Sequence, residues 1–432
     1  IHVRGFTKDT HSKVKNKGTF QGVIEKIPYL KDLGINQIQC MPVYEFEEAG
    51  MRINYWGYGP GYYFAPKSAY AKDGDGVKGL KDLVKYCHKA GIEVVLEMPF
   101  AEGISGLMVT DCLRNYVMEY HVDGFILNPY NVPMDIILKD PILTGVRILK
   151  HAEEYQNVMR RFLKGDEGVV TDVMYQTRKR WDLEGIYNCI TTHTGFTLKD
   201  LVSYDGKHNE ANGENNQDGP DYNYSWNCGA EGETDDPNVN GLRRRLIKNA
   251  FAALLCSRGP AMFFAGDEFC NTQFGNNNAY CQDNIISWLD WSRLEEFKEI
   301  HDFVRHMIQF RKEHPILRKM TKPSSCQFPE ISVHNGTPFN ASTDYKTKLI
   351  GIMYAGRNEE DTEDDIVFYC MNAYWEPLVM QLPVLPNGKH WHVDTNTNAE
   401  YFDGEDFTEK TELLGVNTIR VPARTTIILV AE

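Results

Sequence analysis

Three predicted strands end in residues whose side chains could do chemistry, and one of these residues is an amide. The short apolar run 122–127 follows a helical pattern over 107–120 and leads directly into Asn128. In a closed parallel barrel, catalytic groups lie at the C-terminal ends of the strands. Asn128 therefore occupies a position suited to a nucleophile or a base, but an asparagine amide is a poor nucleophile and no base.

Two histidines and two carboxylates also follow predicted strands. His151 and His193 each come at the end of an apolar run. A histidine can act as a general acid because its pKa lies near neutrality. Glu97 lies near the end of the third predicted strand and Glu102 lies in its continuation, so these two residues are the carboxylates best placed for chemistry. Asp123 lies too early in its strand and is expected to be structural.

A loop over residues 54–66 is dense in aromatic side chains. Aromatic rings such as those of Trp56 and Tyr58 can stack on the apolar faces of sugar rings, or they can pack against one another as the core of the loop. Both alternatives are compatible with the sequence.

Short apolar runs alternate with helical patterns through the first three hundred or so residues, which predicts βαβ units and a parallel sheet. Strands are expected over 2–6, 35–41, 92–98, 122–127, 145–151, 189–196 and 261–265, and helices over 23–33, 80–90, 107–120, 158–163, 242–255 and 292–314. After Arg318 helical periodicity disappears and short β-rich runs take over. The predicted domains are therefore residues 1–318 and an all-β domain over 319–432.

Composition excludes several classes of protein. Of the 432 residues, 42% are hydrophobic and 25% charged, which is typical of a soluble globular protein. The net charge of −14 argues against a nucleic-acid partner. No apolar run is long enough to span a bilayer, and no signal peptide is recognisable. Ile1 lies inside an expected strand, so upstream sequence is expected to have been removed.

Cysteine and acidic residues show no metal-binding pattern. The ten cysteines form no Cys-x-x-Cys pair, which favours reduced thiols and a cytoplasmic location. The acidic and amide residues over 209–223 lack the regular spacing of a calcium loop. We therefore expect no metal and no cofactor, and we expect this segment to be an ordered loop held by hydrogen bonds.

Several motifs together identify a family. They are Thr-His-Thr-Gly-Phe-Thr-Leu-Lys-Asp-Leu-Val-Ser-Tyr over 192–204, Lys-His-Asn-Glu-Ala-Asn-Gly-Glu over 207–214, Ser-Trp-Asn-Cys-Gly over 225–229, Ala-Gly-Asp-Glu over 265–268 and Gly-Asn-Asn-Asn-Ala-Tyr-Cys-Gln-Asp-Asn over 275–284. The chain closely resembles glycogen debranching enzymes of the isoamylase type, in the α-amylase superfamily (glycoside hydrolase family 13). This resemblance implies a (β/α)8 TIM barrel followed by a C-terminal β-sandwich, without the N-terminal β-sandwich that such enzymes usually carry.

Members of this family hydrolyse α-1,6-glucosidic branch points with retention, which requires a nucleophile, an acid and a stabilising carboxylate. The resemblance places these three roles at Asn128, His151 and Thr194, none of which is a carboxylate. The arginine before the nucleophile is replaced by Ile126. His193 and Tyr58 still match the family's sugar-contacting histidine and stacking tyrosine.

The supporting residues are altered as well. The Asn and His that end the third strand's motif are Ala101 and Glu102, and the Asp of that strand is Glu97. The insertion after the third strand is nearly absent. We therefore expect either an open, shallow barrel mouth or a mouth plugged by Phe100, Tyr130 and Tyr155.

Three hypotheses follow from the loss of the catalytic groups. The chain is a non-catalytic homologue that binds α-glucan, maltooligosaccharide or a catalytic partner enzyme; or it is an active glycoside hydrolase with relocated carboxylates at Glu97, Glu102 and Asp123; or it is a structural remnant that binds no sugar. The first is the preferred hypothesis, with Trp56, Tyr58 and His193 as the substrate-binding residues.

Overall fold

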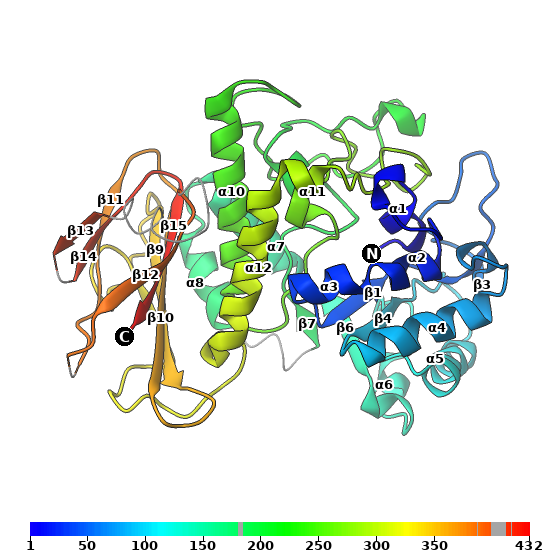
Figure 1. Cartoon of the computed structure of the whole chain (residues 1–432), viewed down its shortest axis with the longest axis horizontal. Helices are drawn as coiled ribbons and strands as arrows, with labels where there is room; N and C mark the ends of the chain where they lie inside the picture. Colours follow the sequence, from blue (N-terminus) through cyan, green and yellow to red (C-terminus); the bar gives the residue numbers. More distant parts are fainter. Residues whose placement is uncertain (180–184, 387, 399–411, 416) are drawn as a thin grey trace.

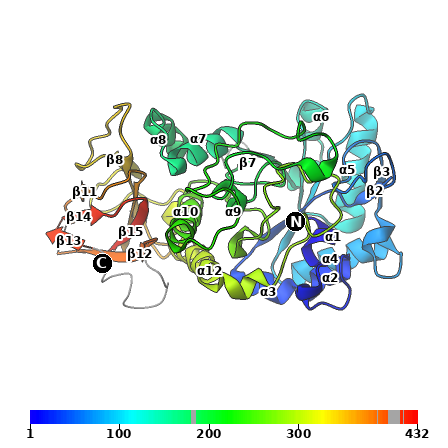
Figure 2. The ribbon, with the colours of Figure 1, turned by 90° about the horizontal axis from the view of Figure 1, so that it is seen from above.

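The computed structural model describes residues 1–179, 185–386, 388–398, 412–415 and 417–432 (Figure 1). A parallel sheet with its helices occupies one end of the molecule and antiparallel sheets occupy the other. The long helices α10 (Pro237–Leu255) and α12 (Lys298–Glu313) lie between these two ends, as both ribbon views show (Figures 1 and 2).

The parallel sheet has five strands in the order β1-β4-β5-β6-β7. They are β1 (Gln37–Cys40), β4 (Glu93–Glu97), β5 (Gly124–Ile126), β6 (Arg147–His151) and β7 (Ile186–Tyr187). All neighbours pair in parallel, so all C-terminal ends lie at one edge. Met41 N donates to Ile1 O at 2.9 Å beyond β1, and Asn188 forms a parallel bridge with Ala261 beyond β7.

Helices follow or precede these strands as the βαβ pattern requires. Their bounds are α1 (Val3–Thr7), α2 (Phe20–Glu25), α3 (Ile27–Leu33), α4 (Gly76–Lys89), α5 (Gly106–Tyr120), α6 (Met134–Ile137), α7 (Glu153–Lys164), α8 (Val170–Arg178), α9 (Leu198–Leu201) and α11 (Arg293–Glu296). Local signals set their ends. Asp236 caps α10 by accepting from Asn238 N at 2.8 Å, and Pro237 supplies the first helical residue.

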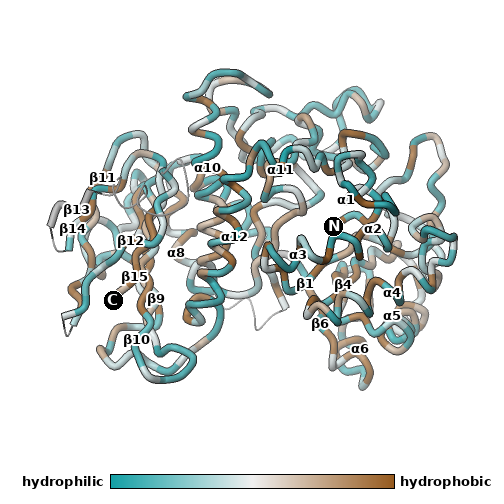
Figure 3. The backbone as a smooth tube through the Cα atoms, viewed as in Figure 1, coloured by the Kyte–Doolittle hydropathy of each residue, from teal (hydrophilic) through white to brown (hydrophobic). Residues whose placement is uncertain are grey.

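Antiparallel strands make up the C-terminal part. One sheet has the order β12-β15-β10-β9-β8 and a second has the order β11-β14-β13. The strands are β8 (Ile331–His334), β9 (Leu349–Arg357), β10 (Asp364–Asn372), β11 (Leu378–Gln381), β12 (Trp391–Asn396), β13 (Glu412–Gly415), β14 (Thr418–Val421) and β15 (Thr425–Ala431). Met353, Phe368 and Leu429 of the first sheet share a core with Met380 and Ile419 of the second. These central strands are among the hydrophobic stretches in Figure 3.

The expected strand over 2–6 is wrong, because these residues form α1. The His2 side chain accepts a hydrogen bond from Gly5 N at 3.1 Å and so caps a helix. Gly5 has no room for a side chain, since a Cβ there would lie 2.1 Å from the Tyr55 hydroxyl.

Two later strands are shorter than expected. The run over 189–196 is a loop after the two-residue β7, and the run over 261–265 contributes one bridge at Ala261. Thr191 and Thr192 direct their hydroxyls into local hydrogen bonds, to Asp267 and Thr194 O, and Gly195 has φ 101°. These features are incompatible with an extended strand. Of the eight strands expected for a complete barrel, the described residues supply five hydrogen-bonded ones.

An antiparallel pair, β2 (Tyr44–Phe46) and β3 (Gly61–Pro66), encloses residues 47–60, so β3 forms the second half of the stretch 54–66 that was expected to be a loop. The pair connects β1 to α4 and fixes both ends of the loop 47–60. In the part of the chain that the structure describes, no helix combines the length and the apolar character required to cross a membrane.

Candidate functional site

Tyr58, Glu97 and His193 form a hydrogen-bonded chain at the C-terminal edge of the parallel sheet. The Tyr58 hydroxyl donates to Glu97 Oε1 and lies 2.7 Å from Nε2 of His193. Because the single hydroxyl proton goes to the carboxylate, His193 must donate from Nε2 to the Tyr58 oxygen. Glu97 is the last residue of β4 and His193 follows β7, so the sheet brings together residues that are distant in sequence.

Asn54 makes two of the hydrogen bonds that hold the loop carrying Tyr58. Asn54 Nδ2 donates to Tyr58 O at 2.9 Å, and Asn54 Oδ1 accepts from Gly57 N at 3.0 Å. Gly57 has φ 81°, and a Cβ at this position would lie 2.3 Å from the Phe46 ring. A glycine is therefore required here, and the loop has one conformation that points Tyr58 toward Glu97.

Burial determines the protonation of His193 and Tyr58. It lowers the pKa of His193 below its ordinary value, and the nearby Glu97 acts in the opposite direction. Burial and Glu97 together raise the pKa of Tyr58 well above its ordinary value. Near neutral pH, His193 is therefore uncharged and Tyr58 is protonated, so both can form hydrogen bonds with a neutral polar ligand.

Trp56 supports His193 from the side. Its side chain is buried, and its ring meets the His193 ring edge-on, with the centroids 4.8 Å apart and an interplanar angle of 89°. Trp56 belongs to an aromatic cluster with Tyr55, Tyr58 and Tyr280. The loop thus packs as a small core, and it also leaves Tyr58 at a cavity wall.

The three residues expected at the positions of the family's carboxylates differ in their surroundings. Asn128 is exposed after β5, and its Oδ1 accepts from Tyr130 N at 3.0 Å, which closes a local turn. Thr194 is exposed and lies on the wall of the same cavity as Tyr58. His151 is the last residue of β6, and its side chain lies outside the described part of the structure.

The alternative carboxylates do not gather at one place. Glu97 lies on the cavity wall, whereas Glu102 is exposed on the following loop and is not among the described residues that line the cavity. Asp123 lies before β5, where it accepts from Val94 N at 2.7 Å and pairs with His88 Nε2 at 2.8 Å. Asp123 therefore joins two elements, as expected for a structural residue.

A cavity of 1070 Å³ begins beside Tyr58, Glu97 and His193 and extends between the strands toward their N-terminal ends, where Gln37 and Glu93 line it. Ile126 and Leu149 line its middle part. Ile126, expected from the sequence to occupy the position of the family's arginine, gives this part of the cavity an apolar side chain.

The expected shallow or plugged mouth is therefore wrong. Phe100 is buried against Tyr63, with ring centroids 4.9 Å apart, and Tyr155 is buried and donates to Ala253 O at 3.1 Å. Tyr130 is 94% exposed. Each ring is thus engaged elsewhere or faces solvent, and none of the three is among the described residues that line the cavity.

Helix α7 adds two buried hydrogen-bond donors to the wall, Gln156 and Arg160, one helical turn apart. Arg160 Nε donates to Ile190 O at 2.6 Å, and Nη1 lies 3.5 Å from Asn223 O. Among the residues described, Arg160 Nη2 and Gln156 Nε2 have no hydrogen-bond partner. Both donor atoms are fully buried within the wall, so a ligand in the cavity could reach them only after the side chains move.

Sequence reasoning missed these two residues. Their spacing of four along α7 was the available signal, because it places both on one face of a helix. The sequence alone did not indicate that this face borders the cavity.

Asp267 anchors the segment that carries His193. It accepts from the Thr191 hydroxyl and from Leu198 N, the latter at 2.8 Å. Its side chain is buried, and burial raises its pKa to about 7. A second carboxyl, Glu268, accepts from Tyr29 OH and from Gly266 N, each at 2.7 Å.

The amide-rich segment is ordered by hydrogen bonds, as expected. Asn209 Nδ2 donates to Asn277 Oδ1 at 2.9 Å, and Asn277 Nδ2 donates to Pro220 O at 2.8 Å and to Asn223 Oδ1 at 3.0 Å. Asn277 thus ties the segment 209–223 to the motif 275–284. Because Pro220 and Asn223 line the cavity, this network also shapes its wall.

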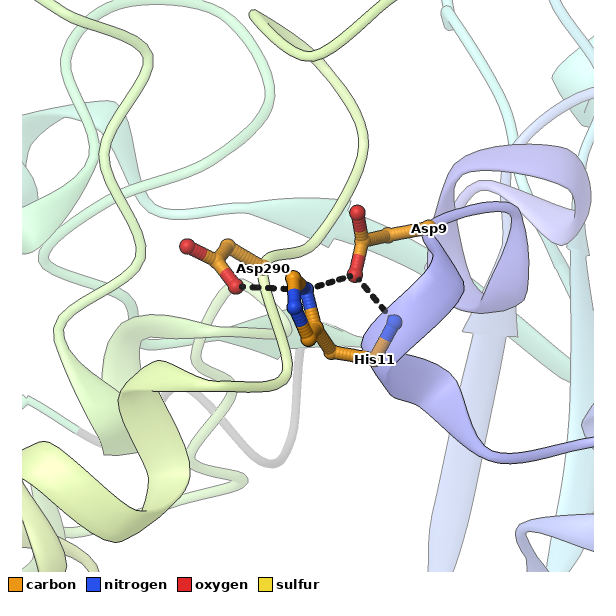
Figure 4. Close-up of side chains that lie close together, drawn as sticks. All are labelled: Asp9, His11 and Asp290. Atoms are coloured by element: carbon orange, nitrogen blue, oxygen red, sulfur yellow. Dashed lines mark hydrogen bonds and ion pairs between the residues drawn. The ribbon is translucent and has the colours of Figure 1, made fainter.

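Asp9, His11 and Asp290 lie close together elsewhere on the molecule (Figure 4). His11 Nδ1 is 3.0 Å from Asp9 Oδ1 and 3.6 Å from Asp290 Oδ1. Both aspartates already act in local turns, since Asp9 accepts from His11 N and Asp290 accepts from Ser292 N. These contacts account for the arrangement without a metal ion.

Comparison with known proteins agrees with this architecture. The family model described as "Alpha amylase, catalytic domain" matches residues 2–100. Pullulanase from Bacillus acidopullulyticus has a similar fold, with a TM-score of 0.74 at 22% identity, over 100% of this chain and 60% of the pullulanase chain. The catalytic module of the glycogen-degrading pneumococcal virulence factor SpuA gives a TM-score of 0.76 at 16% identity, over 100% and 78% of the two chains.

Curated relatives are also similar in sequence. Isoamylase 3, chloroplastic, of Oryza sativa subsp. japonica is 32% identical over 93% of this chain and 63% of its own length. The glycogen operon protein GlgX homolog of Mycobacterium bovis is 28% identical over 99% of this chain and 75% of its own length. The chain thus spans slightly less than two thirds of that isoamylase. On these comparisons, the chain is similar to proteins of the isoamylase and GlgX type, and its first hundred residues match the alpha-amylase catalytic domain.

Proposed function

We propose that this chain is a non-catalytic member of its family that binds α-glucan or maltooligosaccharide. The observation that carries this proposal is the contrast between two parts of the site. Tyr58 and His193, which match the family's sugar-contacting residues, line the cavity and are held in place. Asn128, at the nucleophile's position, is an exposed amide that closes a local turn.

The requirements of retaining hydrolysis also support a non-catalytic role. Retaining hydrolysis needs two carboxyl groups on opposite sides of the scissile bond. The positions of the three family carboxylates hold Asn128, His151 and Thr194. An uncharged His193 and a protonated Tyr58 can bind hydroxyl groups, but they cannot stabilise an oxocarbenium-like transition state by charge.

Two measurements test the proposal. Isothermal titration with maltoheptaose should detect binding, and a reducing-end assay on glycogen, amylopectin and pullulan should give no more signal than a buffer blank. Absence of binding would favour the third hypothesis, a structural remnant that binds no sugar.

An active α-1,6-glucosidase with relocated carboxylates is the second candidate. One observation favours it, since Glu97 lies on the cavity wall and is hydrogen-bonded to Tyr58. Its supposed partner Glu102 is exposed on the next loop. If the wild-type chain hydrolyses a glucan, Glu97→Gln and Glu102→Gln should each abolish that activity.

Several further assignments belong to this proposal. They are a barrel domain over 1–318, a C-terminal β-sandwich over 319–432, a cytoplasmic location, a catalytic homologue as a second partner, and no binding of nucleic acid. Co-purification with a catalytic isoamylase-type enzyme tests the partner, and limited proteolysis near residue 318 tests the domain boundary.

A further inference from the structure

Trp375 is an exposed tryptophan that is held in one orientation. It lies between β10 and β11, and 57% of its surface is exposed. The Arg424 guanidinium lies 3.9 Å from its ring centroid, and the Trp226 ring meets it edge-on with centroids 5.3 Å apart. Tryptophan is enriched among the residues that contribute most binding energy at interfaces, and here its ring is both exposed and fixed.

The turn that presents Trp375 is rigid. Asn372, which is fully buried, donates from Nδ2 to the carbonyl oxygens of Glu376, Val421 and Pro422 at 2.9, 3.1 and 3.0 Å. Its Oδ1 accepts from Tyr374 N at 2.9 Å. Because this order exists before any ligand arrives, binding at Trp375 costs little conformational entropy.

Arg424 fixes the ring from the protein side. It is buried, its Nη1 donates to Lys164 O at 2.7 Å, and its backbone N donates to Tyr374 O at 3.0 Å. Its guanidinium covers one face of the indole of Trp375 through a cation–π contact, which leaves the exposed surface of that ring to a ligand.

Aromatic side chains lie between the cavity and Trp375. Tyr222 and Tyr224 line the cavity, Tyr222 is 86% exposed, and Trp226 follows two residues later against Trp375. One short segment therefore passes from the cavity wall to the exposed tryptophan. Spaced aromatic rings along such a path suit a polymer of rings with apolar faces.

We propose that Trp375 and Trp226 form a second contact site for an α-glucan chain, reached from the cavity along Tyr222. This inference rests on the proposed function, since it assumes that the cavity binds glucan. A neutral sugar polymer fits better than an anionic ligand. The cation at this site, Arg424, is buried behind the Trp375 ring and already donates to Lys164 O.

Affinity electrophoresis through a native gel that contains glycogen tests the site. The wild-type chain should be retarded, and Trp375→Ala should bind glycogen about tenfold more weakly, a factor that corresponds to about 1.4 kcal/mol. Trp375→Tyr keeps an aromatic face and should recover most of the retardation. Tyr62→Ala is the matched control, since it removes another exposed aromatic ring, on β3, at the far end of the molecule (Figure 1).

Titration with maltoheptaose separates this inference from the proposed function. We expect two binding sites per chain in the wild type and one in Trp375→Ala, with an unchanged melting temperature for Trp375→Tyr. If wild type and Trp375→Ala bind glycogen equally, or if a folded Trp375→Tyr chain fails to recover binding, the second site is refuted while the cavity proposal stands. If the wild-type chain binds no glucan at all, both are refuted.

Discussion

Tyr58 and His193 are joined by a contact of 2.7 Å between the tyrosine hydroxyl and the imidazole Nε2, and the same hydroxyl donates to Glu97. The three side chains come from a loop, a strand end and a second loop. Their positions relative to one another are therefore set by the parallel sheet and not by local sequence. Under the proposed function, this hydrogen-bonded unit is the part of the site that binds a sugar.

Removal of the Tyr58 hydroxyl should weaken sugar binding. In Tyr58→Phe, Glu97 and His193 both lose a hydrogen-bond partner, so the ring positions at the cavity mouth become less fixed. We expect the affinity for maltoheptaose to fall by about 1.5–3 kcal/mol, the usual contribution of one hydrogen bond with a charged partner. Isothermal titration measures this change.

Tyr280→Phe is the matched control for that experiment. Tyr280 belongs to the same aromatic cluster, and its hydroxyl donates to the carboxylate Glu214, but it is not among the described residues that line the cavity. The affinity of this variant should equal that of the wild type. Equal losses in both variants would mean that the effect comes from the stability of the loop, and that Tyr58 has no direct part in binding.

Asn128→Asp alone should not restore hydrolysis. The change returns a carboxylate to the nucleophile's position, but His151 and Thr194 still stand where the acid and the second aspartate are required, and Ile126 replaces the arginine. Catalytic groups must also be placed within fractions of an ångström. Reducing sugar released from pullulan over many hours provides the measurement, and any release above that of the wild type would overturn the non-catalytic assignment.

Much of the fold could be predicted from local sequence. The expected strand over 92–98 contains β4, and the helix expected over 242–255 lies within α10, because both segments combine a clear apolar pattern with end signals. The expected strand over 2–6 failed for a reason that the pattern could not show. The His2 side chain caps a helix, and Gly5 of that helix packs closely against Tyr55 from a distant loop. Neither contact is visible in the local sequence pattern.

The site was predictable only in part. Tyr58 and His193 were found through the resemblance of short motifs, and the structure places both on one cavity wall. Gln156 and Arg160 were missed, since a helix face shows its periodicity in the sequence but not the neighbour it faces. The cavity itself was missed because its volume depends on how strands distant in sequence pack, and no local pattern reports that.

The polar network around Asn277 should prove necessary for the cavity wall. Asn277 is fully buried and bonds to Asn209, Pro220 and Asn223. In Asn277→Ala these groups lose their partners, so the free energy of unfolding should fall by about 2–3 kcal/mol. The affinity for maltoheptaose should fall as well, because Pro220 and Asn223 line the cavity.

Urea denaturation and titration measure the two effects. Asn115→Ala, on α5, is the control, since Asn115 is partly buried in a helix. It should leave both quantities nearly unchanged. An Asn277→Ala chain with lower stability but unaltered affinity would show that the wall keeps its shape without the network.

Asp267 should make stability depend on pH. Burial raises the pKa of this carboxyl to about 7, while in the unfolded chain it keeps its ordinary value near 3.8. Below that ordinary value both states hold the proton. Between the two values the folded state keeps a proton that the unfolded state has released, so the contribution of Asp267 to the free energy of unfolding falls by about 1.4 kcal/mol for each pH unit and levels off above about pH 7.

Asp267→Asn isolates this contribution. The amide can keep one oxygen for Leu198 N, and its NH2 group can donate to the Thr191 hydroxyl, so the packing around it is preserved. Groups distant from Asp267 titrate alike in both chains and cancel in the difference, which reports Asp267 together with its coupling to Glu268 and Asp200. Urea denaturation from about pH 5 to about pH 8 should therefore show that the wild type loses stability relative to Asp267→Asn as the pH rises. A difference that stays constant across this range would mean that Asp267 is ionised in the folded chain throughout, and that its bonds to Thr191 and Leu198 outweigh the cost of burying its charge.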